Sequence, residues 1–160
     1  MDEKLRNYTV RIATVKDVEE ISRLYEKFFK YHSLIDPYLC AAAMESGDYP
    51  RSVIEKTSGD IIIVESESNI VGFVHVEEEK TPPYPSVVQH KYCSIVDFFV
   101  LSDYRKRGFG KALFEHVKCW SLKRELDHIR LNVIENNEVG KSFYEKENFR
   151  TSSRIMIYEL

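Results

Sequence analysis

One stretch of the chain, Val96–Leu113, constrains the fold more than any other. It begins with an apolar run, Val96-Asp-Phe-Phe-Val-Leu101, which is typical of a buried strand and stops at Ser102-Asp103. A basic turn with glycines follows, Arg105-Lys-Arg-Gly-Phe-Gly110, and an amphipathic helix opens from it. A helix that begins there presents several free backbone N–H groups at the positive end of its dipole. The stretch therefore predicts a strand, a phosphate-binding loop and a helix in succession.

Two common phosphate loops do not match this turn. A Walker loop ends in Gly-Lys-Ser or Gly-Lys-Thr, whereas Gly110-Lys111 is followed by Ala112, so the hydroxyl that binds magnesium is missing. A dinucleotide fingerprint needs a third glycine where this chain has Leu113. From the loop alone, a plain helix start with solvated basic side chains remains an alternative.

The pattern Arg-x-x-Gly-x-Gly after an apolar strand and Ser-Asp-Tyr does match. It resembles the acyl-CoA pyrophosphate loop of the GNAT superfamily of N-acetyltransferases. The resemblance implies that the loop cradles the pyrophosphate of acetyl-CoA and that the first turn of the helix assists. The residues so implied are Arg105, Lys106, Arg107, Gly108, Phe109, Gly110 and Lys111.

A second segment, Asn137–Phe149, supports the same family. It resembles the family's pattern N-x-x-A-x-x-x-Y-x-x-x-G-F, with Asn137 and Tyr144 in register. There are two departures: Gly140 replaces the usual alanine, and Asn148 replaces the glycine before the final phenylalanine. Asparagine also tolerates the left-handed backbone that ends many helices, so the second change is mild. Gly140 weakens the helix but leaves room for a ligand to approach.

The resemblance covers residues 8–159 and implies one GNAT acyl-CoA N-acyltransferase domain over residues 1–160. Its α/β (α+β) fold has a mixed, mostly antiparallel sheet flanked by helices on both faces. Periodicity and turn signals agree with this order of elements. The expected strands are Tyr8–Ala13, Ile61–Val64, Ile70–Val76, Tyr92–Leu101, Ile129–Val133 and Ser153–Glu159, and the expected helices follow Thr14, Gly108 and Asn137, with a helical or irregular stretch before Ser58.

The resemblance also implies the activity, which is acetyl transfer from acetyl-CoA to a primary amine. In the family the central strand separates from its neighbour, and the pantetheine arm of the cosubstrate pairs with the exposed edge. Main-chain groups of Phe98, Phe99 and Val100 would make those contacts, and Asn137 would bind nearby CoA atoms. The motifs do not distinguish a small, polyamine-like acceptor from a protein amino group. The run Asp97-Phe-Phe-Val100 resembles that of polyamine acetyltransferases and slightly favours small amines.

Two residues are the candidates for proton transfer. By its register, Tyr144 would protonate the leaving thiolate, because a phenol and a thiol have similar pKa values. On spacing alone it could equally belong to an aromatic core cluster with Phe143 and Phe149. The glutamate that polyamine acetyltransferases carry before Asp97 is Val96 here, so either Asp97 or a water chain must serve as the base.

Four other side chains are weaker candidates. His75 and Glu77 on the neighbouring strand are possible bases, although such residues are more often simply solvated or hydrogen-bonded. His32 and Asp36 lie where the family usually builds the acceptor pocket, and a turn cap is an equal alternative for Asp36. Glu77-Glu-Glu79 would more often be a solvated hairpin end than an amine site.

Composition excludes several other classes. A net charge of −3 and a pI near 6.0 argue against nucleic-acid binding. No apolar run approaches the length of a membrane span, and the polar residues 1–4 do not resemble a signal peptide. Three scattered cysteines predict a reduced, cytoplasmic protein, and the histidine spacing predicts no metal site.

Two alternatives to an enzyme remain open, together with the oligomeric state. A non-catalytic acyl-CoA-binding or sensor module would keep the loop and lack a base. A nucleotide-binding module is disfavoured by the failed motifs. The resemblance makes a homodimer possible.

Overall fold

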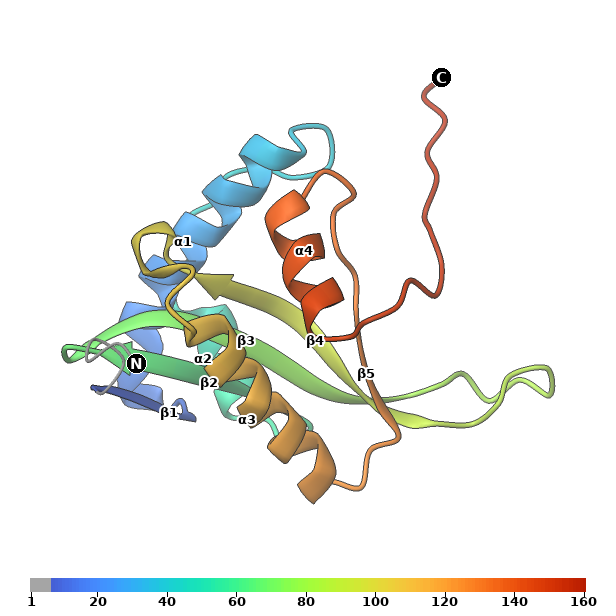
Figure 1. The fold of residues 1–160 in the computed structure, drawn as a ribbon, viewed down its shortest axis with the longest axis horizontal. Coiled ribbons are helices and arrows are strands. Elements are labelled where there is room, and N and C mark those ends of the chain that lie inside the picture. The colour runs from blue at the N-terminus through green and yellow to red at the C-terminus, as the bar shows by residue number, and fades with distance from the viewer. Residues whose placement is uncertain (1–6) are drawn as a thin grey trace.

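The computed structural model describes residues 7–160, so the polar start considered above lies outside it. One five-stranded sheet forms the centre, in the order β1-β2-β3-β4-β5, and all neighbours are antiparallel except β4 and β5. Figure 1 shows the helices on both sides of this sheet. The elements are β1 Tyr8–Ile12, α1 Val18–Ile35, α2 Asp48–Ile54, β2 Gly59–Ser66, β3 Asn69–Lys80, β4 Lys91–Val100, α3 Phe109–Lys123, β5 His128–Leu131 and α4 Glu138–Lys146, with short 3-10 turns at Val15–Asp17 and Ser102–Tyr104.

Local sequence explains two of the boundaries. The β2–β3 hairpin turns through Glu67 and Ser68, whose φ values of 52° and 66° give the left-handed pair that a tight hairpin requires. Before α1, the Thr14 N–H donates to Asp17 Oδ2 at 2.7 Å, which is a helix-capping contact between residues three apart. Both boundaries therefore follow from local chemistry.

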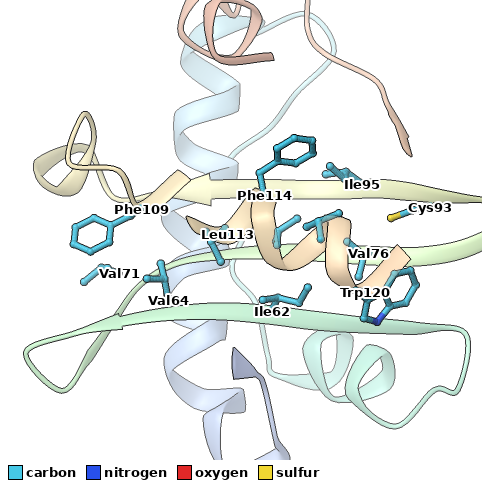
Figure 2. Close-up of a cluster of buried hydrophobic side chains, with 12 residues drawn as sticks. Ile62, Val64, Val71, Val76, Cys93, Ile95, Phe109, Leu113, Phe114 and Trp120 are labelled. Carbon is cyan, nitrogen blue, oxygen red and sulfur yellow. The ribbon is translucent and has the colours of Figure 1, made fainter. Parts of the chain in front are cut away.

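Alternation along the strands divides the core into two layers. On one face, α1 and α2 cover a cluster that includes Tyr25, Ile61 and Phe73. On the other face, Leu113 and Trp120 of α3 lie over the sheet, as Figure 2 shows. Phe143 of α4 and Phe149, which follows the helix, lie at the margin of this second cluster. Strand β4 lies between the layers, so its successive side chains enter different environments.

The expected order of elements is confirmed as far as α4, and the closing strand is wrong. Residues 151–160 form no strand and are exposed throughout. Figure 1 shows this C-terminal segment leading away from the body of the molecule. The alternating pattern of Ser153–Glu159 reports a preference for extended backbone, but pairing requires an adjacent edge that this segment does not reach.

No helix among residues 7–160 has the length and apolar character needed to cross a membrane.

The α3 layer predicts a clear contrast between two leucines of the same helix. Leu113 is fully buried against the sheet, whereas Leu122 is 75% exposed. We expect Leu113→Ala to lower the free energy of unfolding by about 2–5 kcal/mol, because it removes buried methyl groups and leaves a cavity. Leu122→Ala should change it by less than about 0.5 kcal/mol. Urea titration of both variants measures the difference, and equal losses would contradict the packing described here.

Candidate functional site: an open strand edge beside a helix N-terminus

The central feature of the site is the point where β4 loses its neighbour. β5 pairs with β4 only from Tyr92 to Ile95. On its other side β4 stays paired with β3, but the register shifts so that His75 lies opposite Asp97 and Val76 opposite Ile95. Val96 is therefore the extra residue of a β-bulge. Beyond it, one edge of β4 has no strand partner among the described residues.

The direction of the backbone groups along this edge follows from one hydrogen bond. The Leu101 N–H donates to Val71 O of β3 at 2.9 Å. Because main-chain groups alternate along a strand, those of Phe99 also face β3, and those of Phe98 and Val100 face the open side. Val100 O already accepts from Arg105 Nε at 2.9 Å. The N–H and C=O of Phe98 and the N–H of Val100 are therefore free to pair with a ligand. Of the three residues expected to make main-chain contacts with the cosubstrate, Phe99 is directed toward β3 instead.

The glycine turn leads directly into α3. Gly108 has a φ of 88°, a left-handed conformation that favours glycine, and it precedes the first helical residue, Phe109. The first helical hydrogen bond that reaches back to the turn joins Ala112 N–H to Gly108 O at 2.9 Å. The N–H groups of Phe109, Gly110 and Lys111 consequently have no acceptor inside the helix. This is the arrangement that binds anionic oxygen atoms.

The basic side chains of the turn take different positions. The guanidinium carbon of Arg105 lies 4.4 Å from the Tyr31 ring centroid and 5.6 Å from that of Phe99, so this side chain joins the turn to α1. Arg107 lies over Tyr104 at 5.2 Å. Lys106 and Lys111 are exposed. Arg105 therefore has an evident structural role, which the spacing alone did not indicate.

Gly110 has a second reason to be glycine. A Cβ atom there would lie 3.3 Å from Cε2 of Phe143 in α4. The glycine thus allows the N-terminal turn of α3 to approach α4 closely. The resemblance placed Gly110 in the pyrophosphate loop, and the structure adds a role in helix packing.

Asn137 and Asn148 of the second segment lie just outside the two ends of α4. Asn137 caps the helix, because its Oδ1 accepts the Gly140 N–H at 3.0 Å. A Cβ on Gly140 would lie 2.7 Å from Asn137 Nδ2, so the room left by this glycine is used by the cap. The left-handed Asn148, with a φ of 66°, ends the helix as predicted.

Tyr144 faces the open edge of β4 from the α4 side. Its ring centroid lies 6.3 Å from that of Phe98 and 5.5 Å from that of Phe149. The aromatic cluster weighed above is therefore present, and Tyr144 is the member that carries a hydroxyl. Burial raises the pKa of this phenol well above its usual range, so it stays protonated.

Asp97 lies on the opposite face of β4, in a polar cluster beneath α1 and α2. Its Oδ2 accepts the Tyr25 hydroxyl at 3.0 Å and lies 3.5 Å from His75 Nδ1. The same His75 nitrogen lies 3.1 Å from the Tyr49 hydroxyl, and Nε2 lies 2.9 Å from Glu77 Oε1. Asp97, His75 and Glu77 thus form a continuous chain of proton-carrying groups, which the sequence offered only as separate candidates.

Burial sets the protonation of the phenols in this cluster. It is the main reason that the pKa values of Tyr25 and Tyr49 are raised, and the charge of Asp97 adds to it. Burial also raises the pKa of Glu77, but hydrogen bonds from His75 and Lys56 outweigh it and lower the pKa overall. The phenols Tyr25 and Tyr49 therefore stay protonated and can donate hydrogen bonds, whereas Glu77, at the outer end of the cluster, is a carboxylate that can accept a proton.

The remaining candidates have ordinary structural roles. Asp36 Oδ1 accepts the N–H groups of Tyr38 and Leu39 at 3.2 and 3.1 Å, which is the turn cap. The ring of His32 packs against that of Phe28, with 4.1 Å between the centroids, and burial lowers the pKa of His32. Instead of being a solvated hairpin end, the acidic run is paired. Its contacts are Glu77 with Lys56, Glu78 with Arg124, and Glu79 with Tyr92.

Comparison with known proteins decides the family. A model described as the Acetyltransferase (GNAT) family matches residues 18–149. The chain belongs to this family. An uncharacterized N-acetyltransferase of Archaeoglobus fulgidus is 24% identical over 141 residues, which are 88% of this chain and 92% of that protein.

Solved structures agree on the fold of this GNAT chain. A variant of the BH1408 protein of Bacillus halodurans superposes with a TM-score of 0.89 at 23% identity, over 95% of this chain and 99% of that one. An aminoglycoside N-acetyltransferase in complex with CoA superposes with a TM-score of 0.70 at 13% identity, over 96% and 94%. The chain is thus an acetyltransferase of the acyl-CoA-dependent type.

Proposed function

We propose that this protein transfers the acetyl group of acetyl-CoA to a primary amine by direct attack at the open edge of β4. The observation that carries the proposal is the opening between β4 and β5 at Val96, which leads straight to the free N–H groups at the start of α3. An extended arm ending in a pyrophosphate needs both features in this order.

The residues that would hold the cosubstrate are consistent with this use. The main-chain groups of Phe98 and the N–H of Val100 are oriented to pair with a pantetheine arm, and this Val100 N–H could polarise the thioester carbonyl. The turn from Lys106 to Lys111 supplies N–H groups and positive charge for the pyrophosphate. Arg105 would hold the turn in place from the α1 side, and Asn137 Nδ2 stays available to donate because its Oδ1 makes the cap.

Asp97 is proposed as the base that takes the proton of the attacking ammonium. Tyr25 and His75 approach its Oδ2, which leaves Oδ1 for the amine. The proton would then pass through His75 to Glu77, whose side chain is 14% exposed and beside Lys56. A lysine-like amine is only about one part in a few thousand neutral at pH 7, so a base has a large effect there.

Tyr144 is proposed as the acid that protonates the leaving thiolate. It lies on the other face of β4 from Asp97, so amine and thiolate would exchange protons with different groups on opposite sides of the strand. The raised pKa of Tyr144 keeps the hydroxyl ready to donate. Solvent would restore its proton after each turnover.

The function is tested by thiol release from acetyl-CoA across diamines, aminoglycosides, lysine peptides and peptides with free N-termini. We expect release with one of these acceptor classes, because the site provides a route for both protons. Activity on peptides alone would contradict a small-amine acceptor. Thermal stabilisation by CoA with no thiol release in any class would instead indicate a non-catalytic acyl-CoA-binding module.

Replacing Tyr144 by phenylalanine removes the hydroxyl and keeps the ring. We expect the kcat of Tyr144→Phe to fall about a hundredfold or more, with little change in the KM for acetyl-CoA, because the ring contacts to Phe98 and Phe149 persist. Tyr84→Phe, at a 63% exposed position in the β3–β4 loop, is the matched control. Unchanged turnover in Tyr144→Phe would eliminate this residue as the acid.

Replacing Asp97 by asparagine tests the base through the pH profile. We expect Asp97→Asn to lose about a hundredfold or more in kcat at pH 7 and to recover as pH rises toward the pKa of the amine, because only amine that is already neutral can then react. Asp127→Asn, which alters an exposed carboxyl at the start of β5, should keep the original profile. A uniform loss at every pH would indicate a structural role for Asp97.

A further inference from the structure

Of the two phenols in the polar cluster around Asp97, Tyr49 is the one that reaches the surface. It belongs to α2 and is 37% exposed, whereas Tyr25 is fully buried. The Tyr25 hydroxyl donates to Asp97 Oδ2 and is thus used inside the cluster. The Tyr49 ring packs edge-on against the rings of Tyr25 and His75, with 5.5 and 5.7 Å between the centroids. These contacts fix the Tyr49 side chain beside the proposed base.

The outer end of the cluster sets the direction of its hydrogen bonds. Glu77 Oε1 lies 3.0 Å from Lys56 Nζ and 2.9 Å from His75 Nε2. Because a carboxylate oxygen only accepts, Nε2 carries a hydrogen and donates it. In the neutral imidazole Nδ1 then has a lone pair, which accepts the Tyr49 hydroxyl at 3.1 Å. The hydroxyl hydrogen of Tyr49 therefore points into the cluster.

The phenol oxygen of Tyr49 keeps its capacity to accept. A hydroxyl oxygen has two lone pairs, and no side chain among residues 7–160 donates to this one. Burial and the charges of Asp97 and Glu77 raise the pKa of Tyr49, so the hydroxyl stays protonated. An alkylammonium ion has only donors to offer. Its N–H groups consequently match two acceptors in this cluster, Tyr49 Oη and the Asp97 oxygen that Tyr25 leaves free.

We propose that Tyr49 binds the acceptor amine, its phenol oxygen accepting one N–H while Asp97 accepts another. This assignment rests on the acetyl transfer proposed above and adds a second contact to the reacting nitrogen. A single contact would let the nitrogen turn about one N–H···O axis. Two contacts fix where its lone pair appears once Asp97 has taken the proton. The site then requires an ammonium group with at least two N–H bonds, which tertiary amines lack.

Binding of three methylated amines tests the contact without any chemistry. The probes are n-butylamine, N-methylbutylamine and N,N-dimethylbutylamine, titrated calorimetrically at pH 7 into protein saturated with CoA. All three are ammonium ions at this pH, and they carry three, two and one N–H groups respectively. We expect the first two to bind with similar affinity and the third about tenfold or more weakly, because it reaches only one of the two oxygens.

The variant Tyr49→Phe should abolish this step between the second and third probes, since only Asp97 remains as an acceptor. Tyr84→Phe, in the exposed β3–β4 loop, should keep the step. An even decline along the series in the native protein overturns the proposal. The same step in Tyr49→Phe overturns it too, as does an absence of n-butylamine binding.

Kinetics separates this contact from the proposed function. With the amine that releases most thiol in the acceptor screen, we expect Tyr49→Phe to raise the KM for the amine about tenfold or more. The KM for acetyl-CoA should not change. A native KM for the amine, with thiol release intact, would overturn the Tyr49 contact and leave acetyl transfer standing. No thiol release from the native protein with any amine would overturn both. Should urea titration show Tyr49→Phe unfolded, the native three-probe series decides alone.

Discussion

The separation of β4 from β5 after Ile95 is the constraint on which the rest of this structure depends. If β4 and β5 stayed paired along their whole length, β4 would have no free edge for a ligand. The free N–H groups at the start of α3 would then have no extended binding surface next to them. The bulge at Val96 changes the register against β3 and thereby sends Asp97 toward α1 and Phe98 toward α4. One inserted residue thus assigns the polar and the aromatic halves of the site to opposite faces of the strand.

Much of this arrangement could be predicted from the sequence, because it is encoded locally. The apolar run of β4, the left-handed Gly108 and the cap at Thr14 depend on neighbours a few residues away. The contacts that were missed join distant parts of the chain. Arg105 stacks on Tyr31, and His75 links Asp97 to Glu77; neither contact has a signature in spacing. The closing strand expected at Ser153–Glu159 was wrong for the opposite reason, since its local preference for extended backbone is clear but no described strand pairs with it.

In the polar cluster beneath α1, the buried His75 has hydrogen-bond partners that offset its loss of contact with water. Each ring nitrogen of His75 has an oxygen within hydrogen-bonding distance, and no buried side-chain polar atom among the described residues lacks a partner. Such a cluster fixes the positions of its members closely, because moving one leaves another unpaired. Asp97 is therefore held in a defined position whatever its chemical role.

The contact between Gly110 and Phe143 joins two parts of the molecule that would otherwise respond separately. Close packing at this point means that the first turn of α3 cannot shift without displacing α4, and with it Tyr144. Any ligand that draws the α3 N-terminus inward must then alter the environment of that hydroxyl, and by reciprocity the position of Tyr144 must affect how tightly the ligand is held. Through this glycine, ligand binding at the α3 N-terminus and the position of the Tyr144 hydroxyl are coupled.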